Sequence, residues 1–93
     1  MGGFKNRKTI TMRSIHNKKY KAIIAYIRGK REEAGITQKD MTKVLHLRQA
    51  IISKIETCER RIDLLELLQY CRGVNISIQE IVDHLEKMNA SKK

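Results

Sequence analysis

Residues 38–61 read QKDMTKVLHLRQAIISKIETCERR, and their apolar spacing predicts two short helices joined by a tight turn. On each side of the turn, apolar side chains recur with the period of an amphipathic helix. The two stripes are Met41, Val44 and Leu45, then Ile51, Ile52 and Ile55. Isolated helices of under about 12 residues are marginal in water. We therefore expect both to pack against helices that precede and follow them.

Capping signals place a helix on the N-terminal side. Ser14 or Asn17 can cap it, and we expect it to run to about Ala34, with Gly35 supplying the left-handed residue that ends it. Thr37, followed three residues later by an aspartate, then opens the next helix as a short capping box. Gln38 lies in the first turn of that helix, and we expect it to point outward.

Two more helices are predicted on the C-terminal side. Asp63 with Glu66 starts a fourth helix, which we expect to be the most buried and to end at Gly73. Its apolar face comprises Leu64, Leu65, Leu67, Leu68 and Cys71. Ser77 with Glu80 is a full capping box that opens a fifth. The apolar side of this fifth helix comprises Ile78, Ile81, Val82, Leu85 and Met88.

Length and composition favour one all-α domain of five helices. The 93 residues have room for one modest core, and the chain contains no proline and no long alternation of apolar and polar residues. We place the domain at residues 14–89, between an arm at 1–13 and a frayed tail at 90–93. The arm has the basic composition of a disordered segment.

The net charge of +10 is concentrated near the N-terminus. Residues 1–21 hold seven of the 20 basic residues and none of the 10 acidic residues. A basic arm favours a polyanionic partner, either nucleic acid or an anionic membrane surface. The alternative is that the arm serves only solubility.

The sequence gives little support for a catalytic or a metal-binding function. His16, His46 and His84 are scattered, and Cys58 and Cys71 form no CxxC pair. We find no nucleophile motif, glycine-rich phosphate loop or metal-ligand spacing, so we expect no enzyme, no cofactor and no metal. Unpaired thiols, together with the lack of a signal peptide or apolar span, lead us to expect a cytoplasmic protein without membrane attachment.

Residues 20–86 resemble the lambda-repressor-like helix-turn-helix proteins of the Xre type. The resemblance rests on RGKREEAGITQKDMTKVL (28–45), QAIISKIE (49–56) and ERRIDLLELLQYCRGVNIS (59–77). It implies a lambda-repressor-like fold and a transcriptional regulator of bacterial or phage origin that binds double-stranded DNA. The third helix would be the recognition helix.

The resemblance also implies roles for individual residues. Gln38 matches a glutamine that bonds a phosphate and buttresses the recognition helix, and Arg31 with Glu56 matches a partly buried structural ion pair. The positions that read bases are Gln49, Ala50 and Lys54. The sequence departs from the family at four positions. His46 and Cys58 replace glycines, Arg48 replaces a capping serine, and Ile62 replaces a proline.

The chemistry of these side chains suits the implied use. In the major groove glutamine pairs with adenine, lysine with guanine, and a methyl group contacts thymine. Any surface helix can also carry outward glutamine and lysine, so these residues alone do not distinguish a DNA-reading helix from an ordinary one. The residues that flank the helix are therefore needed to decide between the two. Candidates for phosphate contact are Arg48, Ser53, Thr57, Arg60 and Arg61. The side chain of Arg60 or Arg61 is also a candidate to enter a narrow minor groove. Arg48 either contacts a phosphate in this way, or the fold simply tolerates a poor helix cap at this position.

Three functions remain open. The first is a sequence-specific regulator, a repressor that binds as a homodimer to half-sites about 34 Å apart. The second is an antitoxin that neutralises a partner toxin and autoregulates its operon. The third is non-specific binding of nucleic acid or membrane by the arm. The fifth helix, ending in Leu85 and Met88, is the candidate dimer surface unless its stripe belongs wholly to the core.

Overall fold

The chain folds into consecutive α-helices. A computed structural model describes residues 17–91, and the side chains of residues 17–88. The helices are α2 (Lys18–Glu33), α3 (Gln38–Leu45), α4 (Gln49–Glu56), α5 (Leu64–Gly73) and α6 (Ile78–Ser91). Residues 17–91 contain no strand, which confirms the all-α prediction. The predicted arm at residues 1–13 and the capping alternative at Ser14 lie outside the described residues.

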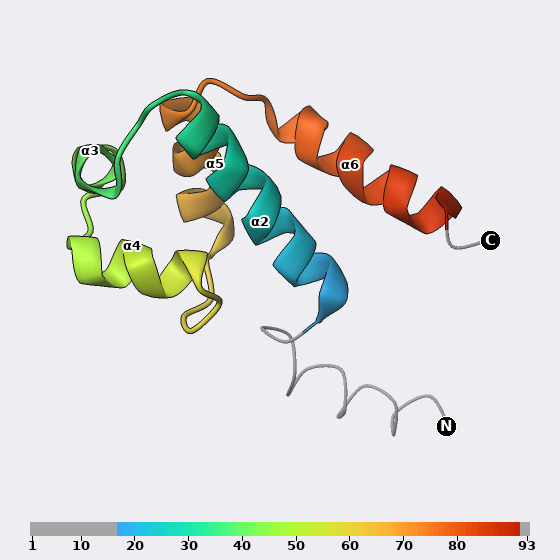
Figure 1. The fold of residues 1–93 in the computed structure, drawn as a ribbon, viewed down its shortest axis with the longest axis horizontal. Coiled ribbons are helices and arrows are strands. Elements are labelled where there is room, and N and C mark those ends of the chain that lie inside the picture. Colours follow the sequence, from blue (N-terminus) through green and yellow to red (C-terminus); the bar gives the residue numbers. More distant parts are fainter. Residues whose placement is uncertain (1–16, 92–93) are drawn as a thin grey trace.

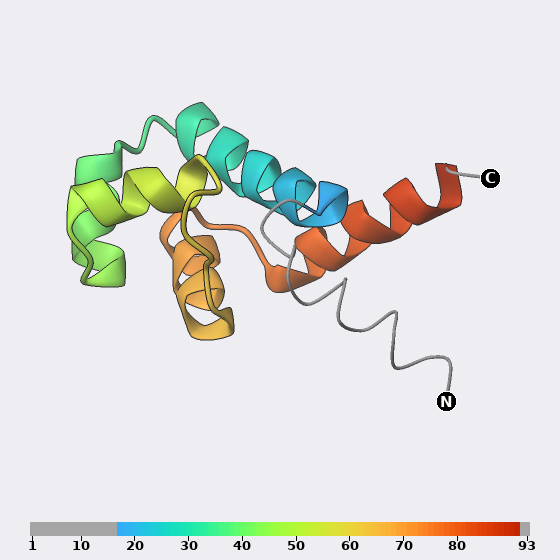
Figure 2. The same cartoon turned by 90° about the horizontal axis from the view of Figure 1, so that it is seen from below.

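Helix α2 occupies the centre of the arrangement. It lies between α6 on one side and the α3–α4 pair on the other (Figures 1 and 2). It packs against α4 and α6, while α3 packs against both α4 and α5. None of the helices in the described part of the chain is long and apolar enough to cross a membrane.

Four of the five helices of the described chain, α2, α3, α5 and α6, begin where their capping residues predict. The Asn17 side chain accepts hydrogen bonds from the amides of Lys19 and Tyr20, at 2.7 and 3.2 Å. Three further helices start with reciprocal capping boxes, which are Thr37 with Asp40, Asp63 with Glu66, and Ser77 with Glu80. Each box satisfies two backbone amides that would otherwise have no partner.

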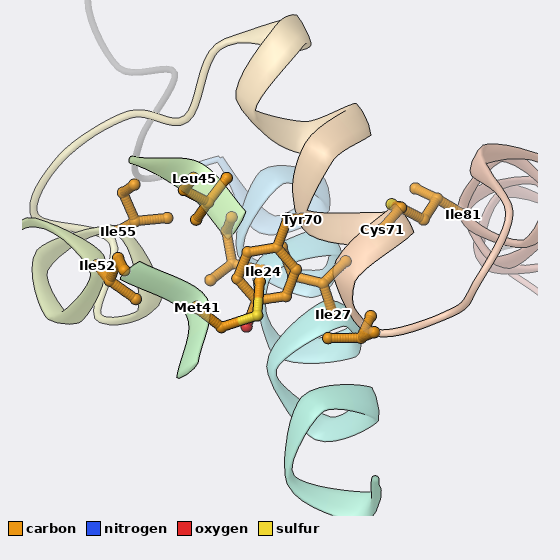
Figure 3. Close-up of a cluster of buried hydrophobic side chains, with 10 residues drawn as sticks. Ile24, Ile27, Met41, Leu45, Ile52, Ile55, Tyr70, Cys71 and Ile81 are labelled. Carbon is orange, nitrogen blue, oxygen red and sulfur yellow. The ribbon is translucent and has the colours of Figure 1, made fainter. Parts of the chain in front are cut away.

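The core joins all five helices around Tyr70 (Figure 3). The Tyr70 ring is fully buried, and isoleucines from α2 and α4 and Met41 from α3 surround it. Cys71 lies beside Ile81, so α6 joins the core through this contact. The fully buried large side chains are Tyr70, Ile24, Ile27, Met41, Ile52 and Ile55.

The prediction that the fourth helix is the most buried is wrong. Within α5 only Tyr70 and Cys71 are buried, whereas Leu64, Leu65 and Leu68 are 69, 64 and 40% exposed. The helix is apolar around most of its circumference, but only one side faces the core. Its apolar composition therefore does not reveal which leucines are buried.

The prediction that the fourth helix ends at Gly73 is confirmed, because Gly73 is the last residue of α5. The positive φ that follows the helix belongs to Asn75, at 62°. Gly73 also lies against α3. A Cβ atom at this position would lie 2.9 Å from Cγ1 of Val44 and 3.3 Å from Cε of Met41. The glycine therefore permits close packing of the two helices.

Both turns that flank α4 keep a left-handed geometry without glycine. His46 has φ 57° and Cys58 has φ 61°, so each adopts the conformation that a glycine would adopt most easily. A left-handed backbone costs an ordinary residue about 1–2 kcal/mol. The replacements of glycine at these positions therefore leave the turn geometry intact.

Candidate nucleic-acid interface

Helix α4 has one face in the core and one in solvent. Ile52, Ile55 and Glu56 are buried. The opposite face carries the three predicted base-reading residues, which are Gln49, Ala50 and Lys54, and all three are exposed. Ser53 is half-buried between the two faces. The outward face of α4 thus brings together an amide, a methyl group and an ammonium group.

Arg48 stands immediately before α4. Its backbone is extended, and its carbonyl accepts the amides of Ile51 and Ile52, but its side chain caps nothing. The side chain is exposed at the positive end of the helix dipole. An anion placed there would meet both the guanidinium and the free amides of the first turn.

A buried carboxylate fixes the other end of α4. The Glu56 side chain is completely buried and accepts two hydrogen bonds from the Arg31 guanidinium, at 2.7 and 2.8 Å. The Tyr70 hydroxyl donates a third at 2.6 Å, and the Gln38 amide donates a fourth at 3.0 Å. Arg31 also donates to the carbonyl of Ile36 at 2.7 Å. This cluster ties α2, α3, α4 and α5 together at one carboxylate.

The cluster shifts the pKa values of its members. Burial raises the pKa of Glu56, but the hydrogen bonds from Arg31, Tyr70 and Gln38 outweigh it, so the net pKa lies below its usual value. Burial and the adjacent Glu56 carboxylate raise the pKa of Tyr70. Glu56 is therefore ionised and Tyr70 neutral at pH 7, as their hydrogen bonds require.

Gln38 is not the outward-pointing side chain predicted from the sequence. It is half-buried, because its amide nitrogen turns inward to Glu56. Its carbonyl oxygen accepts a longer hydrogen bond, 3.5 Å, from the Gln49 amide. Gln38 therefore links the buried carboxylate to the first residue of α4, and this contact limits where the Gln49 side chain can point.

The loop after α4 holds the remaining phosphate candidates, and two of them have partners within the chain. The Thr57 hydroxyl lies 2.6 Å from a carboxylate oxygen of Glu59. Arg60 forms a two-pronged ion pair with Glu66, at 3.0 and 3.1 Å. The Arg61 side chain is exposed and makes no hydrogen bond or ion pair with any described residue. Arg61 is the loop cation most available to a ligand.

Tyr70 is the member of this site that the sequence did not reveal. It lies within an apolar helix, and nothing local indicates that its hydroxyl meets a carboxylate 14 residues earlier. In the described part of the chain, no three His, Cys, Asp or Glu side chains are grouped to hold a metal ion.

Comparison with known proteins agrees with this geometry. A model of the helix-turn-helix family matches residues 27–81. A solved structure, described as an XRE-family like protein from Pseudomonas syringae pv. tomato str. DC3000, is similar with a TM-score of 0.73 and 35% sequence identity. The similarity covers 85% of this chain and 96% of that one. Comparison with curated proteins gave no significant match.

Proposed function

The chain belongs to the Xre-type helix-turn-helix family of DNA-binding regulators, and we propose that it is a sequence-specific repressor that reads the major groove with α4. The observation that carries the proposal is the two-sided placement of α4. One face is held by the core and by the Glu56 cluster, while Gln49, Ala50 and Lys54 are exposed on the other. A helix fixed in this way can present the same side chains to every base pair it meets.

Each exposed group has a matching base edge. A glutamine amide can bond N6 and N7 of adenine, an ammonium can bond guanine, and a methyl group can contact the thymine methyl. Gln49 is restrained by Gln38, which reduces the conformational freedom lost on binding.

Phosphate contacts would supply most of the affinity. Arg48 at the start of α4 and Arg61 after its end bracket the helix and are both exposed. Gln38, Ser53 and Thr57 are secondary candidates because each is half-buried or has a partner within the chain. A net charge of +10 favours fast encounter with DNA.

We further propose that the protein binds as a homodimer to a near-palindromic site with half-sites about 34 Å apart. A second candidate function, an antitoxin that binds a toxin as well as its own operon, draws on the exposed leucines of α5, which leave an apolar surface for a protein. The two are separated by testing whether the protein suppresses the toxicity of its neighbouring gene product.

Methylation interference on a bound duplex tests the major-groove assignment. Dimethyl sulfate methylates guanine N7, which lies in the major groove, and adenine N3, which lies in the minor groove. One reagent therefore probes both grooves. Methylated guanine N7 within each half-site should be depleted from the bound fraction. Interference confined to adenine N3 would place the contact in the minor groove and overturn the assignment to α4.

A further inference from the structure

The loop between α4 and α5 carries the exposed Arg61, and its two halves are held in different ways. Backbone hydrogen bonds tie the first half to the end of α4, because the amides of Glu59 and Arg60 both donate to the carbonyl of Lys54, at 2.8 and 3.1 Å. The backbone of Arg61 and Ile62 forms no hydrogen bond with any other described backbone group. The second half of the loop therefore depends on side chains for its geometry.

Two side chains hold the peptide group that joins Arg61 to Ile62. The Arg60 guanidinium donates to the carbonyl oxygen of Arg61 at 3.1 Å, and the amide of Ile62 donates to the hydroxyl oxygen of Tyr20 at 3.0 Å. A peptide group is planar, so hydrogen bonds at both its carbonyl and its N–H fix its orientation. The backbone from which the Arg61 side chain projects is thereby restrained.

Tyr20 is a fixed anchor for this loop. It lies in the first turn of α2, 42 residues before Ile62, and its ring packs against the core. Tyr20, Arg61 and Ile62 line one hollow of about 220 Å³. Burial raises the pKa of Tyr20, so the hydroxyl is uncharged at pH 7 and places no negative charge beside Arg61.

The arrangement holds the backbone of Arg61 but leaves its guanidinium unpaired. Arg60 is occupied by its ion pair with Glu66, at 3.0 and 3.1 Å. The Arg61 side chain is exposed and has no hydrogen bond or ion pair with a described residue. A charged side chain on a restrained backbone loses less conformational freedom when it binds a phosphate than the same side chain on a loose loop.

We propose that Tyr20 is a positioning residue for DNA binding, whose hydroxyl holds the α4–α5 loop so that Arg61 meets a phosphate beside the contact made by α4. Tyr20 acts through Arg61 and does not itself touch the DNA. The inference rests on the proposed function, because it requires DNA to lie against α4. It gives a role in binding to a residue of α2, outside the two helices of the helix-turn-helix.

Amide hydrogen exchange measured by NMR tests the hydrogen bond without DNA. Tyr20→Phe keeps the ring and removes the acceptor, so the Ile62 amide should exchange about tenfold faster. Tyr26→Phe is the matched control, because it removes a second hydroxyl of α2, which bonds Glu80 instead, and it should leave this amide unchanged. An Ile62 amide that exchanges equally fast in all three proteins would show that Tyr20 does not hold the loop, and would overturn the proposal.

A double-mutant cycle on DNA binding tests whether Tyr20 acts through Arg61. Dissociation constants for one duplex are compared among the wild type, Tyr20→Phe, Arg61→Ala and the double variant, and circular dichroism checks that each is folded. Tyr20→Phe should weaken binding severalfold in the wild-type background. It should change the Kd by less than about twofold once Arg61 is alanine, since about twofold is the precision to which independent effects add. Equal losses in both backgrounds would contradict the proposal, because Tyr20 would then act independently of Arg61.

This inference and the proposed function fail in different ways. Sequence-specific binding that is unaffected by Tyr20→Phe would overturn the role of Tyr20 alone. Binding without sequence preference, but with a loss in Tyr20→Phe that depends on Arg61, would overturn the sequence-specific function alone. A wild type that binds no DNA would overturn both.

Discussion

The hydroxyl of Tyr70 donates a 2.6 Å hydrogen bond to the buried carboxylate of Glu56. Tyr70 lies near the end of α5 and Glu56 is the last residue of α4. The bond therefore holds the candidate recognition helix against a helix that does not itself touch DNA in the proposed complex. It also places α5 and its exposed leucines in a fixed relation to α4.

Tyr70→Phe keeps the buried ring and removes only this bond. A hydrogen bond to a charged group contributes about 1.5–3 kcal/mol, so the variant should lose stability in that range. Urea unfolding followed by circular dichroism measures it. Tyr26→Phe is the control, because the Tyr26 hydroxyl bonds Glu80 at 3.2 Å in a half-buried position, and its loss should be smaller. An equal loss of stability in both variants would show that the hydrogen bond of Tyr70 contributes no more than that of Tyr26.

Stability should fall in acid through two carboxylates. Burial opposes ionisation of Glu56, but its hydrogen bonds lower its pKa, and the Arg60 guanidinium lowers the pKa of Glu66. A carboxylate with a lowered pKa in the folded state stabilises the protein above its unfolded pKa of about 4.3. This stability is lost as the pH falls through the folded pKa.

Glu66→Gln tests the direction of that effect. The variant should be less stable than the wild type at pH 7, and the difference should shrink as the pH falls from about 4.3 through the lowered folded-state pKa of Glu66, below which the wild-type carboxylate is also protonated. Unfolding free energies from urea titrations between pH 7 and 3 would reveal it. A difference that stays constant or widens in acid would contradict the assigned shift.

Two glycine substitutions should have opposite effects. Gly29 has nothing within 4 Å of an added Cβ, so Gly29→Ala should stabilise the protein by about 1 kcal/mol through helix propensity. At Gly73 the added Cβ would meet Val44 at 2.9 Å, and overpacking costs about 1–3 kcal/mol. Gly73→Ala should therefore lower the thermal midpoint, and adding Val44→Ala should remove that clash. A stabilising Gly73→Ala in the wild-type background would disprove the tight contact.

The two loop arginines should differ in their effect on the salt dependence of DNA binding. The Arg61 side chain makes no hydrogen bond or ion pair within the described chain, so Arg61→Ala should make the slope of log K against log salt shallower by about one unit. Arg60 is paired with Glu66, and Arg60→Ala should change the slope less while lowering stability. Fluorescence anisotropy titrations on one duplex at several salt concentrations measure both. Equal slope changes would mean that Arg60 leaves Glu66 to bind phosphate.

The sequence predicted those features that depend on near neighbours. Capping boxes such as Thr37 with Asp40 act across three residues, so the helix starts follow from local chemistry. The face of α4 follows from its apolar period, which left Gln49 and Lys54 outside.

The features that were missed depend on distant parts of the chain. Gln38 turns inward because of a carboxylate 18 residues away, which no local pattern reveals. Leu64 and Leu65 were expected to be buried, since a helix that is apolar on most sides gives no sign of which side meets the core. The end of α5 at Gly73 was predicted, but the contact of Gly73 with Val44 in α3 was not, because it joins two helices that are distant in sequence.

Selection of bound sequences from random duplex DNA tests the central claim most directly. The wild type and Gln49→Ala would be compared at about 0.15 M salt, where charges separated by more than about 8 Å are largely screened. Gln69→Ala, in α5, is the control. The wild type and the control should enrich the same inverted repeat. Gln49→Ala should lose about 1–3 kcal/mol of preference at one adenine position in each half-site. No enriched sequence, or an unchanged site with Gln49→Ala, would contradict base reading by α4.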